Sequence, residues 1–267
     1  MGNADATAAA GDAALLKIEM QGAVLTVGLN RPAKRNALND GIIREIGDCF
    51  ADLPDEVRAV VIHGIGDHFS SGLDLSELRE RDATEGLVHS QTWHRVFDRI
   101  QYSRVPVIAA LKGAVIGGGL ELACAAHIRV AEPSAYFALP EGQRGIFVGG
   151  GGSVRLPRLI GVSRMTDMML TGRVYSATEG LTFGFSQYLV EDGGSLAKAL
   201  ELGEKIAGNA PLTNFAVLQA LPMIAEANPQ TGLLMESLMA TVAQSDQEAK
   251  RRIRAFLDHK TAKVKPT

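Results

Sequence analysis

The sequence predicts an α/β fold, because short apolar runs typical of strands alternate with amphipathic helical patterns over the first two thirds of the chain. After about residue 195 the strand pattern stops, and three segments read as helices, at 195–207, 213–225 and 231–257. A third observation is the glycine run 117–119, which lies between an apolar strand pattern at 105–111 and a helical pattern. These features predict a mixed α/β core followed by a helical C-terminal region.

The first elements read as a hairpin and a capped helix. Residues 15–29 form two apolar runs that turn at Gln21-Gly22, as expected of a β-hairpin. Asn39 is a candidate N-cap for the helix that follows. The apolar residues that would share the buried face of this helix are Ile42, Ile43, Ile46 and Phe50.

The middle of the chain continues the alternation. Residues 59–63 read as a short buried strand, 75–81 as a short helix and 84–100 as a longer helix. The strand 105–111 then leads toward the glycine run.

The glycine run predicts a site for negative charge. It opens a helix that carries Glu121 in its first turn. Backbone N–H groups at a helix start have no partner within the helix, and that end of the helix is positive. Because glycine lets a ligand approach the backbone closely, such a site can hold an oxyanion and carry out proton chemistry beside it.

A second carboxylate, Glu141, follows two short apolar segments, 127–131 and 135–139. A turn separates these segments, so they read as two strands of a hairpin. This geometry would return Glu141 toward the start of the helix that carries Glu121. Two glutamates that face one pocket suit paired acid/base chemistry.

In four segments the chain resembles the crotonase superfamily, the enoyl-CoA hydratase/isomerase family. Their order and spacing fit over roughly residues 13–260, and the combination is much more specific than any one segment. The four segments are 30–38 (NRPAKRNAL), 68–75 (HFSSGLDL), 113–122 (GAVIGGGLEL) and 139–156, which begins Leu-Pro-Glu.

The resemblance implies a domain organisation. We expect a crotonase-type ββα spiral core over residues 13–195, which carries the coenzyme A (CoA) and catalytic site. Residues 196–267 would form a C-terminal helical oligomerisation region. Residues 1–12 are small and polar, so we expect a disordered tail there.

The resemblance also implies catalytic roles. The backbone N–H groups of Leu73 and Gly118 would form an oxyanion hole for the thioester carbonyl of the substrate. Glu121 would act mainly on water, and Glu141 mainly on the α-proton. Coupled carboxylates share their titration, so the two roles overlap in part.

Two further parts of the site depend on the same resemblance. The N–H of Gly149 would hold the water, although Val148 stands where the family usually has proline and four glycines follow it. The wall of the CoA site would be formed by Lys34, Arg35, Asp74 and Leu75.

The implied function is an enoyl-CoA hydratase, a carbon–oxygen lyase that adds water syn across the 2,3 double bond of a 2-enoyl-CoA thioester, as in fatty-acid β-oxidation. Other crotonase chemistries remain open, namely enoyl-CoA isomerisation and an aryl-propenoyl-CoA hydratase/lyase reaction. A noncatalytic acyl-CoA-binding or RNA-associated relative is another class, which both glutamates argue against. A dinucleotide-binding enzyme is less favoured, because Gly113 to Gly117 lacks the G-x-G-x-x-G spacing.

Composition restricts partners and location. The net charge of −3 over 267 residues does not indicate binding to nucleic acid or to an anionic membrane. The N-terminus does not resemble a signal peptide and no apolar run reaches membrane-spanning length, so we expect a cytoplasmic protein. Cys49 and Cys124 read as buried reduced thiols rather than a disulfide.

The expected partner is an acyl-CoA thioester. We expect no metal, because the histidines lack ligand spacing, and no cofactor beyond the CoA of the substrate. The apolar positions of the helical tail suit either an ordinary core helix or contact with a sister subunit. The resemblance favours the second reading and implies a homotrimer or hexamer.

Overall fold

The computed structural model describes residues 14–77, 80 and 82–258, and the expected N-terminal tail lies outside them. Within this described part of the chain, nine strands form two sheets in the order β1-β2-β3-β4-β6-β9 and β5-β7-β8. The strands are β1 (Leu16–Gln21), β2 (Val24–Leu29), β3 (Ala59–Gly64), β4 (Val107–Leu111), β5 (Ala114–Ile116), β6 (Ile128–Ala131), β7 (Tyr136–Ala138), β8 (Tyr175–Ser176) and β9 (Tyr188–Leu189).

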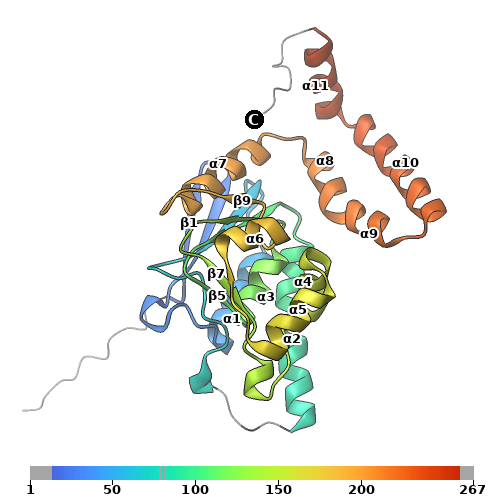
Figure 1. Ribbon diagram of the computed structural model, residues 1–267. Coiled ribbons are helices and arrows are strands. Elements are labelled where there is room, and N and C mark those ends of the chain that lie inside the picture. The colour runs from blue at the N-terminus through green and yellow to red at the C-terminus, as the bar shows by residue number, and fades with distance from the viewer. Residues whose placement is uncertain (1–13, 78–79, 81, 259–267) are drawn as a thin grey trace, which may run out of the picture.

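The helices cover both faces of the larger sheet and continue into a C-terminal extension (Figure 1). The helices of the first two thirds are η1 (Pro32–Lys34), α1 (Asp40–Ala51), η2 (Leu75–Glu77), α2 (Ala83–Gln101), α3 (Gly118–Ala125), η3 (Gly142–Arg144), α4 (Gly152–Ile160), α5 (Val162–Thr171) and α6 (Ala177–Phe183). Those that follow are α7 (Ser195–Ala207), α8 (Pro211–Phe215), the π-helical η4 (Ala216–Ala220), α9 (Leu221–Glu226), α10 (Pro229–Ser245) and α11 (Gln247–Leu257).

The predicted hairpin and capped helix are confirmed. Strands β1 and β2 pair antiparallel around Gly22, whose positive φ of 61° suits glycine. The side chain of Asn39 accepts a hydrogen bond from Ile42 N at 2.9 Å and caps α1. Only the start of the short helix predicted at 75–81 can be compared, because residues 78, 79 and 81 lie outside the described part of the chain.

The central parallel strands β3 and β4 of the larger sheet are buried on both faces, as their nearly continuous apolar sequences require. Alternate residues point to opposite sides of each strand. Val60 and Ile62 of β3 therefore join the core beneath α1 and α2, whereas Val61 joins a second core with Ala199 and Leu202 of α7.

The hairpin predicted from 127–131 and 135–139 is wrong. Strand β6 lies between β4 and β9 in the larger sheet, whereas β7 pairs with β5 and β8 in the smaller one. Both β4–β6 and β5–β7 are parallel pairs, so two similar strand–loop–strand units lie side by side as successive turns of a spiral. This pairing gives each strand a partner along its length and lets both faces be covered, which a two-stranded hairpin alone cannot do.

The packing of α7 changes where the helical extension begins. Ala199 and Leu202 are buried against the larger sheet, next to Val24 and Ile108. Helix α7, which the sequence analysis assigned to the C-terminal helical region, therefore packs on the larger sheet. Sequence periodicity identified the helix but not the surface that it covers.

The helices after Gly208 extend away from the sheets (Figure 1). The helix predicted at 213–225 is a continuous run of α8, η4 and α9. The helix predicted at 231–257 is interrupted at Asp246, whose side chain accepts hydrogen bonds from Glu248 N and Ala249 N and caps α11.

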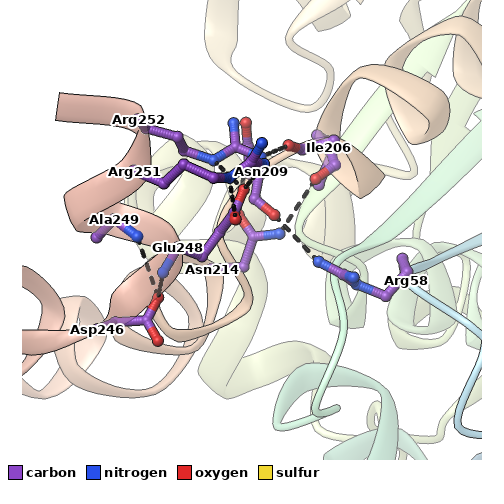
Figure 2. A network of polar contacts seen from close by, with 10 residues as sticks. Arg58, Ile206, Asn209, Asn214, Asp246, Glu248, Ala249, Arg251 and Arg252 are labelled. Carbon is purple, nitrogen blue, oxygen red and sulfur yellow. Dashed lines mark hydrogen bonds and ion pairs between the residues drawn. The ribbon is translucent and has the colours of Figure 1, made fainter. Parts of the chain in front are cut away.

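A polar network holds α11 against the segment that leaves α7 (Figure 2). Arg252 pairs with Glu248 and also donates to the carbonyl of Gly208. From the core, Arg58 donates to Asn209 O at 3.0 Å. The extension is thus tied to the core near its root.

Candidate active site

The glycine run opens a short helix at the centre of the molecule. Strand β5 leads into α3, and every residue of α3 is buried. Gly117 has a φ of 53°, and a Cβ added to it would lie 2.5 Å from Glu141 Oε1. Glycine is therefore needed here both for the backbone turn and for the approach of the carboxylate.

The two predicted oxyanion-hole residues come together at the start of α3. A Cβ built on Gly118 would lie 3.6 Å from Leu73 N, and one built on Gly72 would lie 3.2 Å from Gly118 N. Within the described residues, neither the Leu73 nor the Gly118 amide donates any of the backbone hydrogen bonds found outside helices and strands. Both N–H groups are thus available to a ligand oxygen.

The loop before Leu73 is fixed by Ser70. Its buried hydroxyl donates to Asn36 O at 2.8 Å and accepts a hydrogen bond from Gly72 N at 3.2 Å. Gly72 has a φ of 88° and packs directly on the backbone of Ile116. This arrangement aligns the following amide, that of Leu73, with the helix start.

Glu121 is buried and bound by a second glycine loop, 149–152. Its Oε1 accepts hydrogen bonds from Gly150 N and Gly152 N, each at 2.8 Å. Burial raises the pKa of Glu121, while these amide hydrogen bonds and the charge of Arg155 oppose the increase. A carboxylate oriented in this way can receive a proton from a water molecule.

Glu141 lies at the end of the segment that follows β7. Its Oε2 is buried without a hydrogen-bond partner among the described residues. Burial raises its pKa to about 7, and the nearby charge of Glu121 adds to this effect. Glu141 can therefore give or take a proton near neutral pH.

Both glutamates line a single cavity of about 430 Å³ together with the two oxyanion-hole residues. Trp93, Ile146, Phe147 and Val148 form the apolar part of its wall, as is usual for small-molecule sites. The other residues that line it are Gly86, His89, Ser90, Gly149 and Gly150.

The first two segments of the predicted CoA wall also lie side by side. Ser71 N donates to Arg35 O at 2.9 Å, and Leu38 N donates to Gly72 O at 2.7 Å. The side chains of Lys34, Arg35 and Leu75 are exposed beside this junction. The structure therefore leaves these three side chains accessible at the edge of the oxyanion loop.

The carboxylate of Asp74, a predicted CoA-wall residue, is bound within the protein. The side chain is buried, forms an ion pair with Arg31 at 2.7 Å and accepts hydrogen bonds from the backbone and hydroxyl of Ser76. The Ser76 hydroxyl and Arg31 lower the pKa of Asp74 to about 2. Only the backbone of Asp74 remains a candidate CoA contact.

The glycine loop contributes more to the site than the sequence indicated. Gly149, the predicted water-binding residue, lines the cavity, but the amides that bind Glu121 are those of Gly150 and Gly152. The run of four glycines was the available signal for these two residues. Nothing in the sequence indicated that Phe147 would border the cavity.

No group of three or more His, Cys, Asp or Glu side chains in the described part of the chain is arranged to hold a metal ion. Cys49 and Cys124 are free thiols; Cys124 is buried, as predicted, whereas Cys49 is only partly buried. Between residues 14 and 258, leaving out 78, 79 and 81, no helix has the length and apolarity needed to cross a membrane.

Comparison with known proteins agrees with this fold and site. The sequence model of the enoyl-CoA hydratase/isomerase family matches residues 19–266, so the chain belongs to this family, within the crotonase superfamily. Short-chain-enoyl-CoA hydratase of Clostridium acetobutylicum is 33% identical over 90% of this chain and 94% of its own length. 2,3-Dehydroadipyl-CoA hydratase of Escherichia coli is 34% identical over 94% of this chain and 98% of its own length.

Solved structures give the same relationship. A crystal structure of a provisionally named enoyl-CoA hydratase from Rhodopseudomonas palustris is 83% identical, with a TM-score of 0.91 over 94% of this chain and 97% of that one. An enoyl-CoA hydratase from Bacillus anthracis has a TM-score of 0.86 at 29% identity, over 92% of this chain and 97% of its own. These similarities confirm the crotonase fold that the sequence predicts.

Proposed function

We propose that this protein is an enoyl-CoA hydratase that adds water syn across the 2,3 double bond of a 2-enoyl-CoA thioester. One observation carries the proposal: Glu121 and Glu141 line the same cavity as the open amides of Leu73 and Gly118. The relatives named as hydratases, at about one third identity over most of the chain, support it.

The oxyanion hole supplies the electrostatic part of this reaction. The amides of Leu73 and Gly118 bind the thioester carbonyl oxygen and stabilise the negative charge that develops on it as the enolate forms. The donors are backbone groups on a buried helix and a braced loop, so they need no rearrangement during the reaction.

The two glutamates supply the proton transfers. Glu121, as a carboxylate, takes a proton from water while the water oxygen bonds to C3 of the substrate. Glu141, protonated up to a pH of about 7, gives its proton to C2. Syn addition requires both to act from one side of the double bond, and proton exchange between them or with solvent restores the starting state.

Several finer assignments are part of the same proposal. Lys34, Arg35 and Leu75, with the backbone of Asp74, bind the CoA portion, and no separate cofactor takes part. The N–H of Gly149 contacts the substrate water. The protein acts in fatty-acid β-oxidation in the cytoplasm, as a homotrimer or hexamer that assembles through the helices after Gly208.

The test is to assay the protein with a panel of thioesters, namely crotonyl-, octenoyl-, methyl-branched and cinnamoyl-CoA. Turnover is measured as the loss of the conjugated double bond. We expect hydration of at least one, with 3-hydroxyacyl-CoA as the product, and none with the free acids. Production only of a shifted double bond would indicate an isomerase, and cleavage to an aldehyde would indicate the hydratase/lyase reaction. Binding of thioesters without turnover would contradict an enzymatic role.

A further inference from the structure

The loop that binds Glu121 is itself held from the opposite side by a helix. Ser90, on α2, donates its hydroxyl to Gly149 O at 2.7 Å. Gly149 O and Gly150 N belong to the same peptide group, and Gly150 N donates to Glu121 Oε1 at 2.8 Å.

The geometry of a peptide group couples these two hydrogen bonds. In a planar trans peptide the C=O and N–H bonds point in opposite directions. Fixing the carbonyl of Gly149 toward Ser90 therefore fixes the N–H of Gly150 toward Glu121. A rotation of this peptide would break both contacts together.

The loop needs such a constraint because four successive residues are glycine and Val148 precedes them. Glycine has the largest range of backbone conformations, and the four glycines have no side chains that could hold the loop. Arg155 provides a second constraint, since it donates to Gly150 O at 2.9 Å. That guanidinium is in turn fixed by Asp98 and Gln101 of α2, each at 2.6 Å.

Ser90 also contacts His94, one helical turn further along α2, with 3.3 Å between Ser90 Oγ and His94 Nε2. The single hydroxyl proton of Ser90 is donated to Gly149 O. In this contact, therefore, His94 Nε2 carries the hydrogen and Ser90 Oγ accepts it. The contact orients the hydroxyl toward the loop.

We propose that Ser90, oriented by His94, is a positioning residue for Glu121: by holding the Gly149–Gly150 peptide it directs an amide at the carboxylate. This inference rests on the proposed hydratase function and extends it to α2. Ser90 acts through the peptide, so its predicted effect is on the state of Glu121 rather than on CoA binding.

The test compares Ser90→Ala with Ser90→Thr, which keeps the hydroxyl, and with the control Thr92→Ala on the same helix. Thr92 Oγ1 bonds to Val88 O of its own helix. With crotonyl-CoA we expect kcat of Ser90→Ala to fall about 10- to 100-fold, because the Gly150 N–H would no longer be directed at Glu121 and a hydrogen bond to a charged group is usually worth this much. KM should change less than threefold. Ser90→Thr should recover most of kcat, and His94→Ala should show a smaller loss.

A second readout does not require turnover. Loss of the hydrogen bond from the Gly150 amide destabilises the ionised form of Glu121. The Glu121 carboxyl should therefore titrate at higher pH in Ser90→Ala than in the wild type. The titration is measured by ¹³C NMR of glutamate-labelled protein. The charged groups that face Glu121, Glu141 before η3 and Arg155 on α4, stay the same in this variant. The resonance is assigned by its loss in Glu121→Gln.

The outcomes separate the two proposals. If the wild-type protein hydrates no thioester, the proposed function fails, while the titration of Glu121 still tests the role of Ser90. If the wild type is active and Ser90→Ala matches it in both kcat and titration, the positioning role is overturned and the hydratase assignment stands. A Ser90→Ala variant that loses activity through misfolding would also lose the circular dichroism signal. The ¹³C titration of His94→Ala then decides: a higher titration pH of Glu121 than in the wild type supports the positioning role, and an unchanged one overturns it.

Discussion

Two glutamates carry the chemistry at the residue scale, and isosteric substitutions test them. Glu121→Gln and Glu141→Gln should each lower kcat for crotonyl-CoA by about 10²–10⁴, the usual contribution of general acid/base catalysis. The double variant should lose less than the sum of the two free-energy effects, because the pair acts as a unit. Glu141→Gln should also suppress exchange of the α-proton more strongly than Glu121→Gln does.

The matched control is Glu56→Gln, at an exposed glutamate that does not line the cavity. Its kinetics should equal those of the wild type. Wild-type rates in both active-site variants would contradict the hydratase mechanism, and a reaction that needs only the oxyanion hole would then explain the site better.

Glu141 should also make stability depend on pH. Its pKa is raised from 4.5 to about 7 in the folded state, mainly by burial. As pH rises from about 4.5 to 7, the unfolded chain ionises first, so the free energy of unfolding falls, by at most about 3 kcal/mol. Below pH 4.5 the Glu141 carboxyl is protonated in both states and adds no pH dependence to the free energy of unfolding.

Glu141→Gln should remove this penalty. We expect its melting temperature to exceed that of the wild type at pH 8 and to approach it at pH 4.5, measured by calorimetry with Glu56→Gln as the control. An equal difference at both values of pH would mean that the buried carboxyl is not the cause.

At the scale of elements, the ion pair of Arg31 and Asp74 joins η1 to the oxyanion loop. Arg31 donates both to Asp74 and to Ala37 O, so a single side chain spans the two CoA-wall segments. Asp74→Asn should reduce the free energy of unfolding by about 2 kcal/mol at pH 7, the typical cost of losing hydrogen bonds to a charged group.

Because the carboxylate of Asp74 faces Arg31 and Ser76, KM for the thioester should change little in this variant. Its effect should appear instead in urea unfolding and, through the displaced Leu73 amide, in kcat. Asp67→Asn, at an exposed position of the neighbouring loop, should leave both unchanged. A large rise in KM alone would restore Asp74 as a direct CoA ligand.

At the scale of the whole molecule, the extension leaves large apolar side chains exposed in a single chain. Leu233, Leu234 and Leu238 of α10 are 63%, 61% and 60% exposed, respectively. An apolar surface of this kind on a helix that extends from the core is typical of a subunit interface. We therefore expect an assembly larger than a monomer in sedimentation at micromolar concentration.

The double variant Leu234→Glu/Leu238→Glu should shift the protein toward smaller species, because charge is costly in an apolar interface. Glu236→Gln, on another side of the same helix, should keep the wild-type sedimentation coefficient. A wild-type protein that sediments only as a monomer would contradict the proposed trimer or hexamer.

Local sequence signals were sufficient to predict several elements. The hairpin at Gly22, the cap at Asn39 and the helix after Gly117 all follow from short patterns whose physics is local. The four motif segments were sufficient to identify the superfamily, and they placed Glu121, Glu141, Leu73 and Gly118 at one site.

The packing partners of those elements could be known only from the tertiary structure. The segments 127–131 and 135–139 have the local signals of a hairpin, yet they lie in different sheets because parallel partners from earlier in the chain pair with them. The side chain of Asp74 pairs with an arginine that lies far from it in sequence, and Ser90 of α2 reaches the glycine loop. Such pairings depend on long-range packing, which the periodicity of one sequence does not encode.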